Sequence, residues 1–190
     1  VLLEKNIKKL KNIDGLAICL LFSFLNSSHE ILIKEKLSKS FPNLPISISS
    51  EVQPEFREYE RFSTTAINAY LQPEVGMYME NLKYGIHKIN PNIEVNIFQS
   101  SGGLTTITRA SNFPVRMALS GPAAGVVGAS ETTVKTNFRD LITLDMGGTS
   151  TDVCLIQNGK AELSNLRDIS GFRIRLPMID INTVGAGGGS

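Results

Sequence analysis

The stretch that decides the fold reads Leu141-Ile142-Thr143-Leu144-Asp145-Met146-Gly147-Gly148-Thr149-Ser150-Thr151-Asp152-Val153-Cys154-Leu155-Ile156. An apolar run ends in Asp145, two glycines and three hydroxyl residues follow, and Asp152 opens a second apolar run. We expect a β-hairpin whose tip binds phosphate, because glycines without a Cβ let backbone N–H groups approach an anion. The two carboxylates can hold Mg²⁺ through its water shell. A tight turn with acidic residues is the alternative, since Asp-x-Gly-Gly is common in turns, but the three hydroxyls favour phosphate binding.

The composition limits the classes of partner. A length of 190 residues allows one sizeable core or two small ones. The 19 basic and 18 acidic residues give a net charge of +1, which provides no electrostatic signal for nucleic acid or an anionic membrane. The longest apolar run, Leu16 to Phe24, is shorter than the roughly 20 residues that span a bilayer. We therefore expect neither nucleic acid nor a membrane as a partner.

The cysteines indicate a compartment. Cys19 and Cys154 both lie in apolar runs that resemble strands, so we expect buried free thiols and a reducing, cytoplasmic location. Together with His29 and His87 they show no metal-ligand spacing. The chain begins at Val1 and ends in a glycine-rich loop, and we expect a piece of a larger protein.

The first part of the chain has the pattern of a strand–helix–strand unit. The end of a helix is expected at Ile7–Lys11, and apolar patterns then predict a strand at Leu16–Phe24, a helix at Glu30–Ser40 and a strand at Ile46–Ser49. Such a unit predicts a parallel strand pair. The charged segment Ser50–Arg61 is expected to be a loop, either solvated or functional.

A long helical stretch follows this loop. Thr64 is expected to cap it, and Pro73 is expected to split it into Ala66–Leu71 and Glu74–Lys88. Arg57 has two open readings, a clamp for a substrate carboxylate or an ion pair with Glu55 or Glu58. The remaining expected elements are strands at Glu94–Phe98, Ala161–Leu163, Gly171–Leu176 and Met178–Val184, a turn at Gln99–Gly103, a helix at Ala123–Val134 and an Asn158-Gly159 turn.

Five segments in order resemble the hydantoinase A/oxoprolinase family, namely Ser49–Arg61, Gln99–Gly103, Leu119–Ala129, Asp145–Asp152 and Asp180–Ser190. The family includes ATP-dependent hydantoinases, 5-oxoprolinases and subunits of acetone-type carboxylases. The resemblance implies an α/β fold with ribonuclease-H-like, actin-like ATPase lobes and a mixed sheet with flanking helices, present here as an incomplete domain. Residues 1–49 would be the end of a first α/β lobe, and residues 50–190 part of the central domain with the phosphate-binding hairpin.

The resemblance also assigns roles to residues. Asp145, Thr151 and Asp152 are the expected catalytic residues, and the two aspartates are also the expected Mg²⁺ ligands. The expected ATP contacts are Gly147, Gly148, Thr149, Ser150, Gly185, Gly187, Gly188 and Gly189. The family usually has His in place of Asn182. Asn cannot exchange a proton near neutral pH, so activity would change if that His acts chemically or binds metal, and persist if it only donates a hydrogen bond.

The implied function is ATP-dependent hydrolysis of a cyclic amide. A lactam or hydantoin carbonyl would be activated by phosphoryl transfer before the ring opens, and a second, hydantoinase B-like catalytic subunit or domain is the expected partner. The alternatives are a nucleotide-dependent conformational module of the actin or heat-shock chaperone type and a subunit of an acetone-type carboxylase. Family members carry an earlier glycine-rich phosphate loop that is not visible before Leu16, so we expect the isolated chain to bind ATP weakly.

Overall fold

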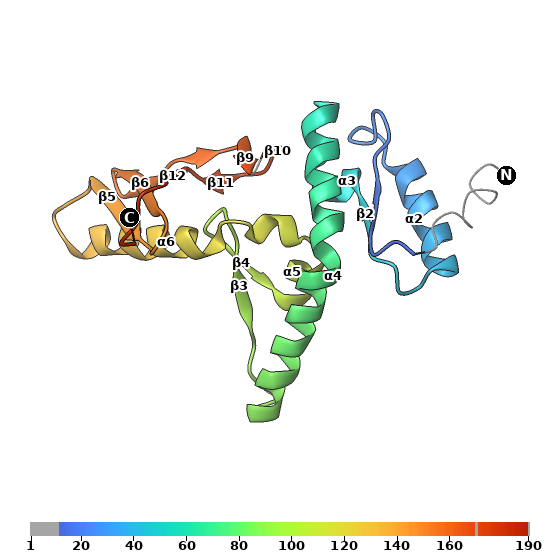
Figure 1. The fold of residues 1–190 in the computed structure, drawn as a ribbon, viewed down its shortest axis with the longest axis horizontal. Coiled ribbons are helices and arrows are strands. Elements are labelled where there is room, and N and C mark those ends of the chain that lie inside the picture. The colour runs from blue at the N-terminus through green and yellow to red at the C-terminus, as the bar shows by residue number, and fades with distance from the viewer. Residues whose placement is uncertain (1–11, 170, 190) are drawn as a thin grey trace. The chain divides into compact units, whose positions relative to one another are not determined.

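The computed structural model describes residues 12–169 and 171–189. The helix end expected at Ile7–Lys11 lies outside these residues. The chain forms two compact units (Figure 1). Among the described residues, unit 1 comprises residues 12–93, 108–115, 168–169 and 171–175, and unit 2 comprises residues 94–107, 116–167 and 176–189. The expected domain boundary at residue 50 concerns the full-length protein and stays a prediction.

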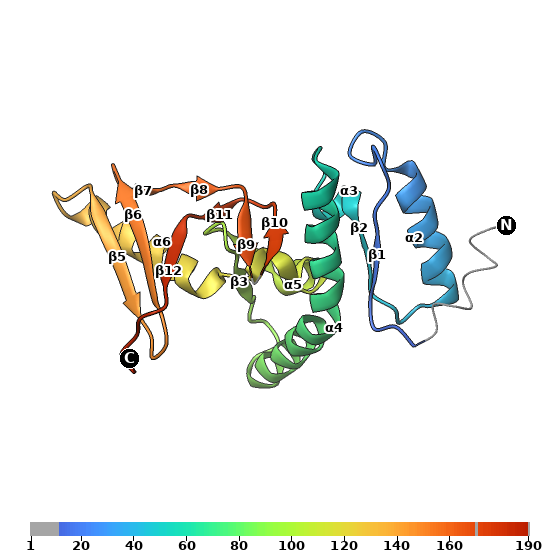
Figure 2. The same cartoon turned by 45° about the horizontal axis from the view of Figure 1, so that its top comes forward.

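Unit 1 contains the expected parallel strand pair. Strand β1 (Leu16–Ile18) pairs with β2 (Ile46–Ile48), and Leu16 lies opposite Ile46. Helix α2 (Ser28–Ser40) connects them, and Figure 2 shows α2 on one side of the pair and α4 (Glu58–Ile89) on the other. The other elements of this unit are α3 (Ser49–Val52), most of α5 (Ile107–Asn112), most of β9 (Arg167–Ile169) and β10 (Phe172–Ile174).

The strand expected at Leu16–Phe24 is too long. It ends at Ile18, and a turn follows at residues 21–25 in which Phe22 adopts a left-handed φ of 57°. The Leu20 N–H donates to Oε1 of Glu30, a partner that lies ten residues away. Because a short apolar run does not distinguish a strand from a turn that buries part of its side chains, the pattern alone overextended the strand.

Helix α4 corrects two expectations. It runs without a break from Glu58 to Ile89 with Pro73 inside, so the predicted split is wrong. Proline removes one backbone hydrogen bond at a cost of about 3 kcal/mol, which the buried residues in the first half of the helix offset. Thr64 is not a cap, because its hydroxyl donates to the Glu60 carbonyl within the helix and accepts from the Arg175 N–H.

The charged segment before α4 is also more ordered than a solvated loop. It contains α3 and the first turn of α4. Arg57 occupies the N-cap position of α4 with a left-handed φ of 74° and no side-chain capping bond. Its guanidinium lies 4.0 Å from the Glu60 carboxylate and forms no ion pair with Glu55 or Glu58. Glu55 pairs instead with Arg175 at 2.7 Å.

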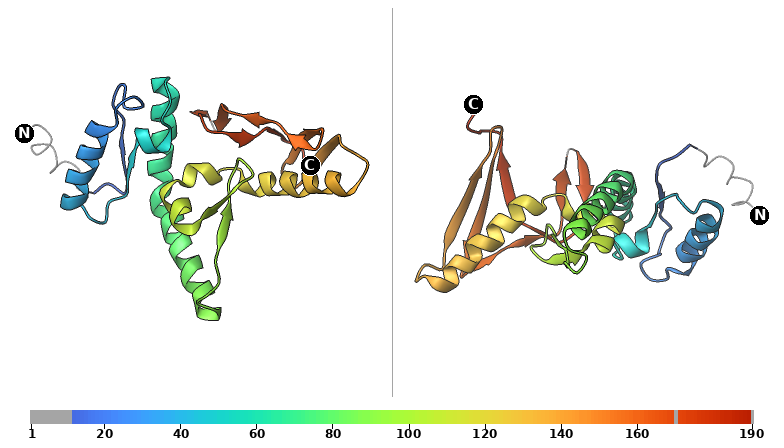
Figure 3. Two further views of the ribbon diagram at one scale, coloured as in Figure 1. Left: turned by 180° about the vertical axis from the view of Figure 1, so that it is seen from behind. Right: turned by 90° about the horizontal axis from the view of Figure 1, so that it is seen from below.

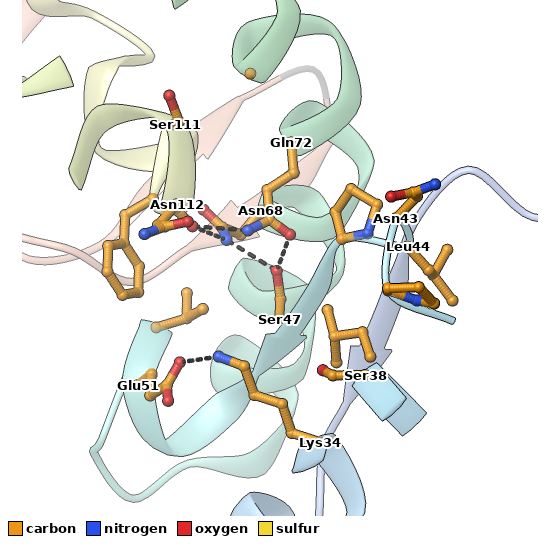
Figure 4. Close-up of a pocket in the computed structure, with 16 residues that line it drawn as sticks. Lys34, Ser38, Asn43, Leu44, Ser47, Glu51, Asn68, Gln72, Ser111 and Asn112 are labelled. Atoms are coloured by element: carbon orange, nitrogen blue, oxygen red, sulfur yellow. Dashed lines mark hydrogen bonds and ion pairs between the residues drawn. The ribbon is translucent and has the colours of Figure 1, made fainter. Parts of the chain in front are cut away.

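A polar network joins β2, α4 and α5 within unit 1 (Figure 4). The amide of Asn68, fully buried, donates to Ser47 Oγ at 2.9 Å and to the Asn112 carbonyl at 3.0 Å. Ser47 in turn donates to Gln72 Oε1 at 2.8 Å. These side chains line a cavity of about 420 Å³. Because each amide is bonded to another protein group, the network fixes the helices to the strand pair.

Glu30 is a second buried polar group in unit 1. Its carboxylate is fully buried and accepts hydrogen bonds from Leu20 N–H, Ser49 Oγ and Ser50 N–H at 2.7 to 2.8 Å. Burial alone would raise its pKa, but the hydrogen bonds outweigh this and lower the pKa of the Glu30 carboxyl. The charged form of Glu30 therefore holds the turn after β1 against the start of α3.

We expect Glu30 to make unit 1 sensitive to acid. A carboxyl whose pKa is lower in the folded state stabilises the fold above its unfolded pKa, and this contribution is lost as the pH falls through the folded pKa. Glu30→Gln should lower stability by about 1–3 kcal/mol at pH 7 and flatten this part of the pH dependence. Denaturant unfolding of the two proteins between pH 7 and pH 3 tests this. Parallel stability curves would refute it, and exposed Glu35→Gln is the matched control.

The main part of unit 2 is a four-stranded antiparallel sheet covered on one face by a helix. Its strand order is β12-β6-β5, with β7 pairing β6. Helix α6 (Ser120–Lys135) packs on the face that carries Cys154, Ile156 and Ile181 (Figure 3). The strands of this sheet are β5 (Leu141–Met146), β6 (Thr151–Gln157), β7 (Lys160–Ala161) and β12 (Ile181–Val184). In separate two-stranded sheets, β3 (Asn96–Phe98) pairs with β4 (Leu104–Thr106), and β8 (Leu163–Ser164) pairs with β11 (Met178–Ile179).

The sequence patterns located most of these elements but missed some. The helix expected at Ala123–Val134 and the Asn158-Gly159 turn are confirmed, the turn with φ values of 51° and 77°. Strand β4, helix α5 and the 3₁₀ turn Pro114–Met117 were not expected. Strands expected at Gly171–Leu176 and Met178–Val184 are present as the shorter β10, β11 and β12. Across residues 12–169 and 171–189, no helix combines the length and the apolar character needed to cross a membrane.

The two cysteines differ in position. Cys154 is buried in β6, as expected, whereas Cys19 follows β1 and is half-buried. Both are free thiols. Burial raises the pKa of the Cys19 thiol to about 11, so this thiol stays protonated and unreactive near neutral pH.

Candidate phosphate-binding site

The predicted hairpin is present in unit 2. Strands β5 and β6 pair in an antiparallel register that places Asp145 opposite Asp152 and Met146 opposite Thr151. Residues 147–150 form the connecting turn, here called the first glycine turn, which the Gly147 N–H closes by donating to the Ser150 carbonyl at 2.9 Å.

Both aspartates lie on one face of the sheet. Directly opposite residues of an antiparallel pair share a face, with Cβ atoms about 4.5–5.5 Å apart. Strand alternation puts Asp152 on the same face as Cys154, which packs on α6. Two like charges in such a pair destabilise a sheet, so the arrangement costs stability that a bound cation would recover.

A groove opens beside this carboxylate pair. It has a volume of about 390 Å³ and lies between α6 and the β5 side of the sheet. It is lined by Pro122, Gly125, Val126, Ala129, residues 141–145, Asp152 and Ile181. Neither aspartate forms an ion pair with any residue that the structure describes. Among the described residues, both carboxylates therefore lie at a groove without an ion-pair partner.

Thr183 orients one of the carboxylates. It lies opposite Asp152 in β12 and donates its hydroxyl hydrogen to Asp152 Oδ1 at 2.6 Å. Asp145, Asp152 and Thr183 thus form one row across three strands. Sequence reasoning missed Thr183, although its two-residue spacing from buried Ile181 places it on the same strand face.

Asn182 lies on the other face of the sheet. It pairs with Val153, which pairs with Leu144, so its side chain belongs to the row next to that of the carboxylates and points the opposite way. The Asn182 side chain therefore does not contact the carboxylate pair. The effect of Asn in place of the family's His stays a prediction.

The first glycine turn contains backbone N–H groups that form no hydrogen bond with the described protein residues. In the described part of the chain, the N–H groups of Gly148, Thr149 and Ser150 have no protein acceptor, whereas the Gly147 N–H is used within the turn. Successive free N–H groups in a turn form a concave anion site. Three consecutive donors next to two carboxylates suit a phosphate that carries a divalent cation.

The other glycine motif lies directly against this turn. Residues 185–189, here called the second glycine loop, follow β12. The Gly188 and Gly189 N–H groups donate to the Gly147 and Gly148 carbonyls at 3.0 and 2.9 Å. The hydroxyl of Thr151 is nearly buried and donates to the Ala186 carbonyl at 2.6 Å. The structure thus brings the two predicted glycine segments together. Gly185 has open space around its Cβ position.

The donor set fits a magnesium ion held together with phosphate. Mg²⁺ takes carboxylate oxygens, keeps several waters and is usually bound through one or two carboxylates plus substrate phosphates. Asp145 and Asp152 supply two carboxylates on one face, and the first glycine turn supplies donors for the phosphate. No cluster of three or more His, Cys, Asp or Glu side chains that could hold a metal occurs among the described residues.

Ser100 and Gly102 give the Gln99–Gly103 motif a structural role in unit 2. Buried Ser100 accepts the Leu119 N–H on its hydroxyl and the Ile179 N–H on its carbonyl. Gly102 has a φ of 84°, and a Cβ there would lie 2.9 Å from Val127 and 3.0 Å from Ile179. The motif therefore fixes the start of α6 relative to strand β11.

Comparison with known proteins places this geometry in a family. The family model for hydantoinase/oxoprolinase matches residues 61–190. The alpha subunit of the caprolactamase of Pseudomonas jessenii is 34% identical over 95% of this chain and 26% of its own length. The 5-oxoprolinase of Dictyostelium discoideum is 35% identical over 95% of this chain and 15% of its own length.

A solved structure supports the same assignment. The crystal structure of the ATP-dependent caprolactamase from Pseudomonas jessenii superposes with a TM-score of 0.84 and 31% identity, covering 99% of this chain and 28% of that chain. The predicted α/β class with an actin-like ATPase arrangement, present as a partial domain, is confirmed. The chain spans less than a third of the length of these relatives. Given the family match and these relatives, the chain belongs to the hydantoinase/oxoprolinase family.

Proposed function

We propose that the natural protein uses ATP to hydrolyse a cyclic amide. The observation that carries this proposal is the pair Asp145 and Asp152, on one sheet face at a groove and next to a turn with three free N–H donors. Family membership and the similarity to caprolactamase and 5-oxoprolinase supply the substrate class.

Each residue of the site has a proposed task. Asp145 and Asp152 hold Mg²⁺ through its water shell. The N–H groups of Gly148, Thr149 and Ser150 donate to a phosphate oxygen, and the negative charge is favoured there because the carbonyls of Gly147, Gly148 and Ser150 are engaged by other backbone N–H groups. Thr183 keeps the Asp152 carboxylate in its orientation.

The chemistry follows from the weak reactivity of an amide. When bound, Mg²⁺–ATP supplies the phosphoryl group that turns the carbonyl oxygen into a leaving group. The protein's contribution is to position the phosphates and neutralise their charge. In this proposal the predicted ATP contacts Gly147, Gly185, Gly187, Gly188 and Gly189 shape the site and do not themselves donate to phosphate.

A second subunit completes the proposed enzyme. The caprolactamase relative is named as an alpha subunit, and we propose that a further catalytic subunit or domain of the hydantoinase B type acts with this protein on the activated ring.

Phosphate release by the natural protein with its partner subunit tests the proposal. We expect at least about tenfold stimulation of ATP hydrolysis by one of 5-oxoproline, caprolactam or hydantoin, because the correct substrate completes the catalytic site. Stimulation only by an unfolded peptide would favour a conformational module, and stimulation only by a ketone would favour the carboxylase branch. Either result would contradict the proposed function.

A further inference from the structure

We propose that the second glycine loop is a support for the first glycine turn, and that Gly187 and Thr151 are positioning residues for ATP. This inference rests on the proposed function. It gives both residues a role other than the direct ATP contact and catalysis that the family resemblance implies.

Hydrogen bonds from the second glycine loop hold the first glycine turn in its orientation. The Gly188 and Gly189 N–H groups are used by the Gly147 and Gly148 carbonyls, so these two donors face the turn and not a ligand. With the carbonyls engaged, the peptide units of the turn are held with their N–H groups on the outside. The loop thereby orients two of the three donors, the N–H groups of Gly148 and Thr149, which share peptide planes with these carbonyls.

The backbone around Gly187 leaves no room for a side chain at this position. A Cβ built on Gly187 would lie 2.6 Å from the carbonyl carbon and oxygen of Gly148 and 2.7 Å from the Thr149 nitrogen. All three contacts are with backbone atoms of the turn, which cannot move aside as a flexible side chain would. Any side chain at position 187 must therefore displace the peptide that presents the phosphate donors.

Thr151, in the neighbouring strand β6, holds the second glycine loop in place. Its nearly buried hydroxyl donates to the Ala186 carbonyl at 2.6 Å across 35 positions of sequence. This bond joins the start of β6 to the loop one residue before Gly187. Because the hydroxyl hydrogen is already used, Thr151 acts on the phosphate site through the loop.

Three alanine substitutions in the natural protein form a graded test. The Cβ of Gly189→Ala would lie 3.0 Å from the Gly148 oxygen, and that of Gly188→Ala 3.8 Å from the Gly147 oxygen. We expect the KM for ATP to rise in the order Gly188→Ala, Gly189→Ala, Gly187→Ala, reaching at least about tenfold, since misplacements near 1 Å cost up to about 100-fold. Gly128→Ala in α6, which meets nothing within 4 Å, is the control.

The Thr151 hydroxyl is tested by a conservative pair. Thr151→Val should raise the KM for ATP severalfold, and Thr151→Ser, which keeps the donor, should restore it. In all variants the KM for the cyclic amide should stay near that of the unaltered protein. A general folding defect would instead lower kcat through the active fraction and leave both KM values unchanged.

The outcomes separate this inference from the proposed function. If the unaltered protein fails to bind ATP in a calorimetric titration, the proposed function fails. If it binds ATP and Gly187→Ala binds equally well, or if the three alanine variants do not follow their contact distances, the supporting role is wrong. Should Gly187→Ala fail to fold, Gly189→Ala and Thr151→Val decide the question.

Discussion

Asp145→Asn is expected to reduce ATP turnover by the natural protein by about 100-fold or more, because one of the two carboxylates proposed to hold the metal loses its charge. The same change should leave stability unchanged or slightly higher, since Asp145 lies directly opposite Asp152 and like charges in that position repel. Steady-state phosphate release and thermal unfolding, measured on the same preparation, give both results.

Asp140→Asn is the matched control for this experiment. Asp140 lies just before β5 and accepts the Asn158 N–H at the other end of the hairpin. Its substitution should cost a little stability and leave ATP turnover intact. Turnover by Asp145→Asn close to that of the unaltered protein would end the assignment of the carboxylate pair.

Arg61→Ala is expected to lower the stability of unit 1 by about 3–5 kcal/mol, as is typical when a buried charged side chain is removed from its network. Arg61 is fully buried and donates to the carbonyls of Leu20 and Glu55. Its guanidinium also lies over the rings of Phe24 and Phe62 at 5.2 and 5.3 Å. The substitution leaves a cavity and removes the guanidinium donor from both carbonyls, so that the Leu20 carbonyl keeps only the 3.4 Å bond from the Ser23 N–H.

Two further variants serve as controls for the Arg61→Ala measurement. Arg57→Ala removes a guanidinium whose side chain is 52% exposed, and its effect should stay within about 0.5 kcal/mol. Arg61→Lys should recover only part of the loss, because an ammonium cannot reproduce the planar fork that reaches two carbonyls and stacks on rings. Equal denaturation midpoints for Arg61→Ala and the unaltered protein would show that the network does not stabilise the unit.

Structural features that depend on residues close together in the sequence were predictable from the sequence. The hairpin over Asp145 and Asp152, helix α2 and the parallel pair β1–β2 follow from apolar periodicity and turn residues within windows of about 10–15 residues. The family was recognisable from the order of five segments. Strand alternation also implied that neighbours such as Asn182 and Thr183 face opposite ways, although the choice of face needed the sheet.

The network residues show where sequence reasoning ended. Arg61 ends a segment expected to be a solvated or functional loop, and Glu30 begins an expected helix. Neither pattern predicted burial, yet both side chains are fully buried, because their partners lie far away along the chain. Helix α4 continues through Pro73 for a similar reason. The packing of the first half of the helix against distant segments outweighs the local cost of the proline.

The candidate phosphate site also combines features that the sequence predicts with features that only the tertiary structure decides. The sequence by itself determined which residues could bind phosphate and metal, because residue chemistry and turn formation are local properties. Only the tertiary structure decided that the second glycine loop lies against the first turn, that Thr151 is bonded to Ala186, and that Asn182 faces away from the carboxylates. Those contacts depend on strand pairing and packing between distant segments, which a local pattern does not encode.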